Sequence, residues 1–391
     1  MRIERAELTF LNLPMVQPEL WAWGRRDSYT VGLVELHTDS GVVGLGEVIV
    51  AMGPNANVVR AIFEQMAEIF VGESPLASER LTAKVMSTGW YAFHRTAALV
   101  LGGLEMACWD AAGKHLGQPV CALMGGALRL SFPSMYFVQG NDDLDVMIAG
   151  ARDAVERGFR TIYFKVGIDE ERDVELVHRT REALGPGPRI RVDANEAWSP
   201  GTAVRILRRM APAVIEYIEQ PTLMHDIEAL AQVRARSGVA VAANQASWGK
   251  YAILEIVRRG AADVIMTDLH QEGGLMAMKK VLGLCEMAGL PFVNHAYNAT
   301  TLTLSAHMHV MSTSPVCFLA MQGHPDYFAD DYVREPLDYS DGTMKFSERP
   351  GLGVEIDPDK AARYRAAFEA EGMSTAYAAS RGGRVLAVPS Q

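Results

Sequence analysis

Six polar residues recur at nearly even spacing along the second half of the chain, each at or near the end of a short apolar run. They are Lys165, Asp193, Glu219, Asn244, Asp268 and His295, and successive members lie 28, 26, 25, 24 and 27 residues apart. A strand, a helix and the two loops that join them need about this length of chain. The regular step therefore predicts repeated βα units whose strands are parallel.

The strand-like runs number eight, which is the strand count of a TIM-type barrel. They are expected at 132–137, 161–166, 190–193, 214–219, 239–243, 263–267, 291–294 and 316–321. In such a barrel the carboxyl ends of all strands meet on one face, so the six polar residues would share one mouth. An open doubly wound sheet is the rival fold. It would normally carry a glycine-rich phosphate turn after an early strand, and the sequence has none there.

The first part of the chain has a different pattern, typical of a small α+β domain. Strands are expected at 3–13, 30–38 and 42–48, and helices at 57–71 and 78–116. The polar, turn-rich sequence after about residue 330 is not expected to extend the barrel. We therefore predict an α+β domain over 1–125, a barrel over 126–330 and a C-terminal segment over 331–391 that packs on the first domain.

Charge and composition exclude several classes of protein. The net charge is −10 and Lys and Arg form no run, so nucleic acid is not expected as a main partner. The first residues lack the apolar segment of a signal peptide, and no apolar run reaches the ~18 residues of a membrane span. The four cysteines lie far apart, as is typical of thiols in a reducing compartment: Cys108, Cys121, Cys285 and Cys317. We expect a cytoplasmic enzyme with no membrane partner.

Three of the spaced residues form a candidate metal site. Asp193 and Glu219 end neighbouring strands, and the next strand ends at Asn244 or Gln245. Two carboxylates and an amide offer hard oxygen ligands, which suit Mg²⁺ and leave positions open for substrate. Each residue alone could be an ordinary N-cap at a strand-to-helix turn. Three such residues in step on consecutive strands favour the metal site, with Asn244 or Gln245 as the third ligand.

The other three spaced residues are candidate acid/base groups. Lys165 follows apolar residues on the second strand, where burial and a nearby cation would lower its pKa. His295 ends the seventh strand, and Asp268 ends the sixth. A carboxylate on the adjacent strand can hydrogen-bond an imidazole, fix its tautomer and stabilise its charged form. Lys165 and His295 would then approach a bound substrate from opposite sides.

This order of residues resembles the enolase superfamily, and the Asp268–His295 pair resembles its mandelate racemase subgroup. A second segment, LEMACWDAAGKHLGQPVCALMGG at 104–126, is similar to the segment that links the capping domain to the barrel in that family. The resemblance implies a modified (β/α)₇β barrel under a capping domain that both termini build. It also implies one Mg²⁺ per subunit and abstraction of the proton α to a carboxylate, giving an enediolate. It assigns acid/base roles to Lys165 and His295, and metal binding to Asp193 and Glu219, with Asp268 orienting His295.

The sequence departs from the family pattern at three positions. Many relatives have Lys-x-Lys on the second strand, whereas this chain has Tyr163 before Lys165. The third metal ligand is usually acidic; we favour the amide of Asn244 over that of Gln245, and an amide would suit a strongly anionic substrate. Racemase-like members carry a Glu at the end of strand eight, where this chain has Gln322.

Substrate specificity in this family resides in loops of the capping domain. The candidates here are 17–27 and 50–57, where Trp21, Trp23 and Arg25 could close over an anionic substrate. A surface loop at an oligomer contact is the alternative explanation of these tryptophans. Gln322 is a further candidate for contact with the substrate.

These observations lead to a functional hypothesis with alternatives. The leading hypothesis is dehydration of an acid sugar, in which Lys165 or His295 removes the α-proton and His295 helps the β-hydroxyl leave. The alternatives are a racemase or epimerase, a sugar-acid lactone cycloisomerase and, more remotely, a non-catalytic sugar-acid-binding protein. We expect a small-molecule carboxylate as the partner, and a homo-oligomer.

Overall fold

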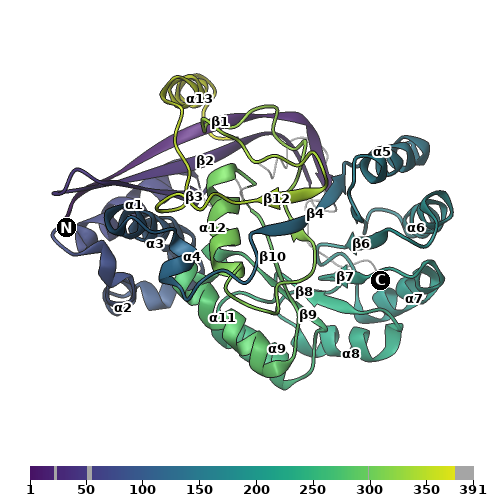
Figure 1. Ribbon diagram of the computed structural model, residues 1–391. Coiled ribbons are helices and arrows are strands. Elements are labelled where there is room, and N and C mark those ends of the chain that lie inside the picture. The colour runs from purple at the N-terminus through teal and green to yellow at the C-terminus, as the bar shows by residue number, and fades with distance from the viewer. Residues whose placement is uncertain (22–23, 51–54, 298, 375–391) are drawn as a thin grey trace.

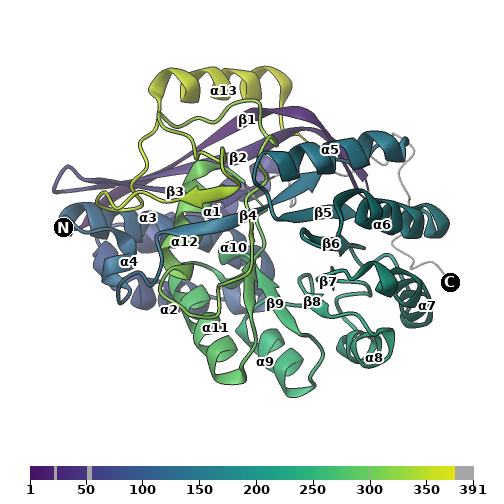
Figure 2. The same cartoon turned by 45° about the vertical axis from the view of Figure 1, so that its right-hand side comes forward.

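The computed structural model describes residues 1–21, 24–50, 55–297 and 299–374, with the backbone alone of 20–21 and 24–27. Figures 1 and 2 show a barrel beside a smaller domain that contains the N-terminal strands and helices. The division of the chain at residues 125 and 330 stays a prediction. None of the helices in the described part of the chain is long and apolar enough to cross a membrane.

The smaller domain is built on an antiparallel sheet of three strands in the order β1-β2-β3. These are β1 (Ile3–Trp21), β2 (Gly24–Thr38) and β3 (Val43–Ile49). The turn from β2 to β3 includes Gly41, whose φ of 77° favours glycine. The described backbone of 17–27 is strand and not loop, because β1 and β2 continue their ladder to Trp21 and Gly24, and the role of this region in substrate recognition stays a prediction.

The helices of the smaller domain follow the sheet in the chain. They are α1 (Ala56–Phe70), α2 (Ser78–Ser87), α3 (His94–Leu116) and α4 (Val120–Leu123), with 3₁₀ turns at η1 (Pro75–Ala77) and η2 (Trp90–Phe93). Of these helices, α1 and α3 pack directly on the strands of the sheet. The single helix expected over 78–116 is interrupted, because Gly89 adopts a left-handed conformation with φ of 99°. Helix α3 packs closely on β3: a Cβ at Gly46 would lie 2.0 Å from the carbonyl oxygen of Gly103.

The barrel consists of eight parallel strands in the neighbour order β10-β9-β8-β7-β6-β5-β4-β11, which confirms the predicted barrel. They are β4 (Ser131–Val138), β5 (Thr161–Lys165), β6 (Arg189–Asp193), β7 (Tyr217–Glu219), β8 (Val241–Ala243), β9 (Val264–Thr267), β10 (Phe292–Asn294) and β11 (Met321–Gln322). The last strand begins later than the expected run at 316–321. Asn294 closes the barrel here, since its side-chain amide exchanges hydrogen bonds with the backbone of Gln322.

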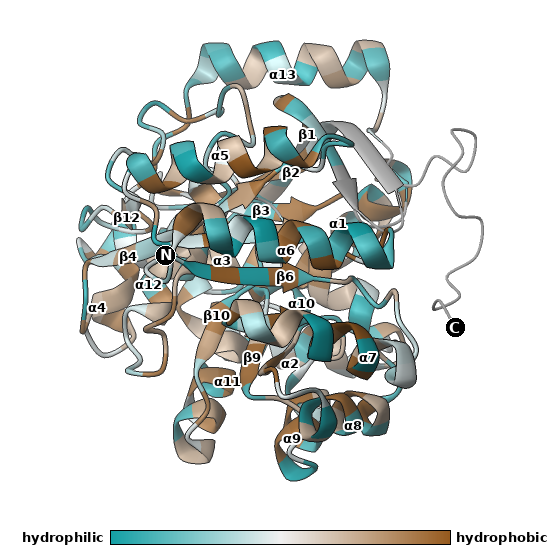
Figure 3. Cartoon of the chain, turned by 90° about the vertical axis from the view of Figure 1, so that its right-hand side faces the viewer, coloured by the Kyte–Doolittle hydropathy of each residue, from teal (hydrophilic) through white to brown (hydrophobic). Residues whose placement is uncertain are grey.

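Every strand but the last is followed by a helix, so the barrel is of the (β/α)₇β type. The helices are α5 (Leu144–Glu156), α6 (Glu170–Leu184), α7 (Pro200–Met210), α8 (Ile227–Ser237), α9 (Lys250–Arg258), the short α10 (Leu269–Glu272), α11 (Leu275–Ala288) and α12 (Thr301–Met311). A further 3₁₀ turn, η3 (Ala211–Ala213), follows α7. The outer helices show both hydrophilic and hydrophobic parts in Figure 3, because one side packs on the barrel and the other meets solvent.

The C-terminal segment contacts both parts of the molecule. Strand β12 (Thr343–Lys345) pairs antiparallel with β4 of the barrel. Helix α13 (Pro358–Glu371) lies along β1 of the smaller domain, above the sheet in Figures 1 and 2. The segment therefore joins the cap to the barrel.

Candidate active site

A cavity of about 280 Å³ lies where the cap meets the carboxyl ends of the barrel strands. From the strand ends, Lys165, Gln245 and His295 reach its wall, and Gln322 also lines it. The cap contributes Glu19 and Tyr29, and the stretch of chain after β11 contributes Tyr327. The cavity is therefore enclosed by parts of the chain that are far apart in sequence.

Two fully buried carboxylates lie side by side at the ends of β6 and β7. Asp193 is the register partner of Glu219, and Lys165 is the register partner of Asp193. The Tyr163 hydroxyl is 2.6 Å from Asp193 Oδ2 and 3.2 Å from Glu219 Oε2. The Lys165 ammonium donates to the same Asp193 oxygen at 2.7 Å. Tyr163 therefore bridges the two carboxylates, and Lys165 shares the same oxygen of Asp193.

The charges of this cluster act on one another. Burial raises the pKa of Glu219 well above its usual range, and the neighbouring Asp193 raises it further. Burial would lower the pKa of Lys165, but Asp193 and Glu219 outweigh it and raise that pKa. Glu219 Oε1 is buried and accepts no hydrogen bond from any described residue. A buried carboxylate oxygen without a donor is the kind of group that a cation satisfies.

Of the two amide residues that follow β8, Gln245 lines the cavity. Its Oε1 is buried and has no hydrogen-bond partner within the described part of the chain. Asn244 is fully buried and is not among the residues that line the cavity, and its Oδ1 and Nδ2 likewise have no partner among the described residues. The side-chain oxygen of Gln220 accepts from the backbone N–H of Asn244 at 3.1 Å and of Ala246 at 3.0 Å, which fixes the backbone on both sides of Gln245.

The third ligand stays a prediction between Asn244 and Gln245, of which Gln245 is the one at the cavity wall. The spacing contained a signal for the alternative, because the steps from Asp193 to Glu219 and from Glu219 to Gln245 are both 26 residues. Among the described residues, no group of three or more His, Cys, Asp or Glu side chains could hold a metal. The candidate donor set is therefore two carboxylates and one amide.

His295 follows β10 and lines the cavity without the partner that the sequence suggested. Its Nδ1 is buried and bonds to no residue that the structure describes, and its ring centroid lies 4.3 Å from that of Tyr297. Burial lowers the pKa of His295 to about 3, and the positive charge of Lys165 acts in the same direction, while Asp268 opposes them. His295 is therefore neutral near pH 7.

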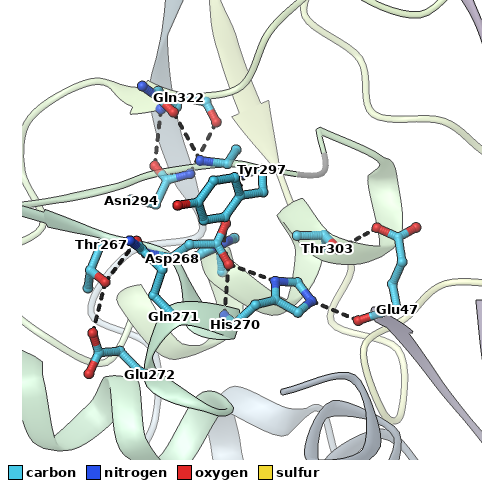
Figure 4. A network of polar contacts seen from close by, with 12 residues as sticks. Glu47, Thr267, Asp268, His270, Gln271, Glu272, Asn294, Tyr297, Thr303 and Gln322 are labelled. Atoms are coloured by element: carbon cyan, nitrogen blue, oxygen red, sulfur yellow. Dashed lines mark hydrogen bonds and ion pairs between the residues drawn. The ribbon is translucent and has the colours of Figure 1, made fainter. Parts of the chain in front are cut away.

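The expected hydrogen bond between Asp268 and His295 is not formed. Asp268 Oδ1 instead pairs with His270 Nδ1 at 2.6 Å, as Figure 4 shows. Asp268 is also the N-cap of α10, and its Oδ2 accepts from the backbone N–H of Tyr297 at 3.0 Å. The hydrogen-bonding role expected for Asp268 toward His295 is therefore corrected: its carboxylate is turned to His270.

The candidate substrate-binding residues fall into two groups. Gln322 lines the cavity, but its Oε1 accepts from the backbone N–H of Ala296 at 2.9 Å, so it braces the segment that follows His295. Trp23 and the side chains of Trp21 and Arg25 lie outside the described residues. Their predicted contact with substrate stays a prediction.

Sequence reasoning missed the residues that the cap and the stretch of chain after β11 bring to the cavity. Glu19 on β1 is buried, and its Oε2 accepts from the Tyr327 hydroxyl at 2.5 Å. Tyr29 on β2 donates its hydroxyl to the backbone oxygen of Tyr297. No local pattern marks these residues, because the two partners of the first contact are 308 positions apart.

Two family models match the chain. The model described as the enolase C-terminal domain-like family matches residues 146–360, and the mandelate racemase / muconate lactonizing enzyme N-terminal domain matches residues 5–125. The chain belongs to the enolase superfamily. Within it, the two models place the chain in the mandelate racemase subgroup, as the sequence predicted.

Individual relatives agree with this assignment. D-galactarolactone cycloisomerase of Agrobacterium fabrum is 29% identical, covering 85% of this chain and 90% of that protein. Arabinonate dehydratase of Saccharolobus solfataricus is 27% identical, covering 82% and 87%. The crystal structure of muconate lactonizing enzyme from Pseudomonas fluorescens with muconolactone superposes with a TM-score of 0.87 at 25% identity, covering 93% and 99%.

The protein is therefore an enzyme of the enolase superfamily, whose matched members include dehydratases, racemases and cycloisomerases. Members of this superfamily use Mg²⁺ in general and share enediolate chemistry at a carboxylate substrate.

Proposed function

We propose that the protein is a Mg²⁺-dependent lyase that removes the α-proton of a sugar-acid carboxylate and then eliminates the β-hydroxyl as water. The observation that carries the proposal is the arrangement of the cavity. Lys165 and His295 come from different strands and line the same space, next to the buried pair Asp193 and Glu219. A ligand in this space can meet proton-transfer groups from two directions.

The donor set fits a hard divalent cation. Asp193, Glu219 and Gln245 would hold Mg²⁺, since the first two are carboxylates and both Glu219 Oε1 and Gln245 Oε1 lack hydrogen-bond partners among the described residues. Bound Mg²⁺ would supply positive charge against the substrate carboxylate as its α-proton leaves. The raised pKa of Glu219 agrees with this, because burial and the neighbouring Asp193 both disfavour its negative charge, and a divalent cation would stabilise that charge.

The position of Lys165 suits a role in proton transfer. Its Nζ lies 2.7 Å from Asp193 Oδ2, and that contact keeps its pKa high. Lys165 shares Asp193 with the candidate metal site, so a cation held by Asp193 would weaken the effect of that carboxylate on Lys165, and burial would then lower the pKa of Lys165 toward the range of a useful base. The protonation state of Lys165 would therefore be linked to occupancy of the metal site.

His295 is suited to accept a proton first and donate it afterwards. It is neutral near pH 7, so it can accept the α-proton of the substrate or another proton that is released during the reaction. The α C–H electron pair forms the new C=C bond, the C–O bond to the β-hydroxyl breaks, and protonated His295 gives that hydroxyl its proton, so that water leaves. The enol product then converts to a 2-keto-3-deoxy acid.

A second candidate reaction uses the same groups without dehydration. Two proton-transfer groups on different strands are also what racemisation, epimerisation or lactone opening requires. The similarity to D-galactarolactone cycloisomerase favours lactone opening among these. The non-catalytic alternative has less support, because a binding protein has no need of both Lys165 and His295 in its cavity.

Proton NMR in deuterium oxide tests the proposal directly. The protein with Mg²⁺ is incubated with pooled hexonic, pentonic and hexaric acids and their lactones. We expect loss of one α-proton signal and formation of a keto acid from an open-chain acid. Exchange without a keto product would indicate epimerisation, and a keto product from a lactone alone would indicate a cycloisomerase. No exchange with any member would contradict the proposal.

Two variants assign the roles of the acid/base groups. His295→Asn should abolish turnover while Mg²⁺ binding survives, and the matched control His115→Asn, at an exposed position on α3, should retain full activity. If His295→Asn loses turnover but still exchanges the α-proton, Lys165 is the base and His295 the later acid. Normal turnover in His295→Asn would show that His295 has no role.

A further inference from the structure

A buried histidine that the mechanism above does not use lies between the cap and the acid/base group. His270 is fully buried in α10, where α3 of the cap packs against it. Its Nδ1 is 2.6 Å from Asp268 Oδ1, and its Nε2 is 2.7 Å from the backbone oxygen of Glu47 on β3. Figure 4 shows the ring between these two oxygens.

Both ring nitrogens of His270 therefore face oxygens that accept hydrogen bonds. A carbonyl oxygen can only accept, and a carboxylate that already receives other N–H groups also accepts. Neutral imidazole has one N–H and would leave one of these two short contacts without a proton. We infer that His270 is held as an imidazolium that fixes and neutralises Asp268, so that His295 works as a neutral imidazole.

Asp268 is fixed in its orientation toward His270. Its Oδ1 also accepts the backbone N–H of His270 at 2.8 Å, and its Oδ2 accepts that of Tyr297 at 3.0 Å. Its own backbone N–H donates to the side chain of Gln271, completing a capping box at the start of α10. Turning the carboxylate toward His295 would break these bonds.

The cap supplies the second oxygen and holds it in place. The Glu47 carboxyl group is fully buried and accepts from the hydroxyls of Thr300, Thr303 and Tyr332. These residues belong to the barrel and to the C-terminal segment, so Glu47 joins three parts of the chain. The packing of the cap on the barrel therefore positions the Glu47 carbonyl, which accepts the second hydrogen bond of the charged His270.

The surrounding charges agree with this assignment. Burial would lower the pKa of His270, but Asp268 and Glu47 outweigh it and raise that pKa. The groups that act on His295 are Asp268 on one side, and Lys165, His324 and His307 on the other. His307 Nε2 also lies 3.5 Å from Asp268 Oδ2. With Asp268 paired to His270, its ability to stabilise a charged His295 is reduced.

The acid/base role of His295 rests on the proposed function, but the charge state of His270 does not. His270 is thus a positioning residue: it acts on the reaction through Asp268 and His295. A neutral His295 can accept a proton at once at neutral pH, whereas an imidazole paired with a free carboxylate would carry a proton more of the time. His270 therefore determines the protonation state in which His295 contacts the substrate.

Nitrogen-15 NMR of histidine-labelled protein, without substrate, tests this inference. The spectra of the wild type and of His270→Gln are followed from pH 4 to pH 9, and the signals of His270 and His295 are assigned by their loss in His270→Gln and His295→Asn. We expect His270 to remain doubly protonated at pH 7 and His295 to be neutral. In His270→Gln the pKa of His295 should rise by about 1 to 2 units, because Asp268 loses its cation.

Two results would overturn the inference: a neutral His270 in the wild type at pH 7, or a pKa of His295 that does not move in His270→Gln. The exposed His115→Gln serves as the matched control and should leave both signals unchanged. If His270→Gln does not fold, the charge state of His270 in the wild type, assigned through its bonded backbone atoms, still decides. Because no substrate is used, failure here leaves the proposed dehydration standing, and failure of α-proton exchange leaves the His270 assignment standing.

Discussion

The replacement Glu272→Gln should stabilise the protein, because it removes a buried group that would otherwise have to ionise as the pH rises. Glu272 ends α10 beside a second cavity between cap and barrel, and it is 7% exposed. Its Oε1 accepts from Thr267 and from the backbone N–H of Gly249, while its Oε2 is buried and meets no donor among the described residues. The side-chain oxygen of a glutamine can accept the same two hydrogen bonds as Oε1. Its amide nitrogen can take the place of Oε2, so that neither of these hydrogen bonds is lost.

The expected gain follows from the pKa of Glu272. Burial raises this pKa from 4.5 to about 8. The folded protein therefore holds a proton at neutral pH that the unfolded chain releases, and this difference destabilises the fold progressively as the pH rises from 4.5 to about 8. At ~1.4 kcal/mol per pH unit, the penalty is under ~1 kcal/mol at pH 5, about 3 kcal/mol at pH 7 and about 5 kcal/mol at pH 9. Glutamine has no such penalty.

Thermal unfolding at the three pH values measures this difference. For a chain of 391 residues, a gain of about 3 kcal/mol raises the melting temperature by roughly 4 °C. The gain over wild type should be small at pH 5 and grow toward pH 9. Glu79→Gln, at an exposed residue on the rim of the same cavity, is the matched control and should change little. A Glu272→Gln variant that is less stable than wild type at pH 7, or whose gain does not grow with pH, would refute the reasoning.

Three further predictions follow from the site and the fold. Mg²⁺ at 100 times its dissociation constant should stabilise the wild type by about 2.7 kcal/mol. In a thermal shift assay, Gln245→Ala should lose most of this stabilisation by Mg²⁺. Asn244→Ala should keep it, even if the variant is less stable than wild type without Mg²⁺. Gly46→Ala should lower stability in urea unfolding by about 1–3 kcal/mol, because the added Cβ would lie 2.0 Å from a carbonyl oxygen of α3; an unchanged midpoint would contradict that contact. Glu19 lines the cavity and its charge acts on Lys165. Glu19→Gln should therefore raise the ratio of kcat/KM for hexaric acids to kcat/KM for hexonic acids about tenfold, or ~1.4 kcal/mol. An unchanged ratio would place the distal end of the substrate away from Glu19.

The sequence by itself determined the barrel and the strands that present the candidate groups. The spacing between successive polar residues, from Lys165 to His295, is set by the length of a βα unit. The alternation of side chains along a strand is set by its period of two residues. Both patterns are local properties of the chain. The positions of Lys165, Asp193 and Glu219 at adjacent strand ends followed from the same rule, and the register pairs of the structure contain these three residues.

Only the tertiary structure decided which atoms these groups meet. Spacing from Glu219 allowed both Asn244 and Gln245, and only the structure shows that Gln245 is the one at the cavity wall, with the side chain of Gln220 fixing the backbone on either side of it. The partner of Asp268 could not be read from its neighbour on the next strand, because His270 is held in place by a carbonyl 223 residues earlier in the chain. A local period specifies which face a side chain occupies. It carries no information on which distant segment covers that face, and here the cap supplies that segment.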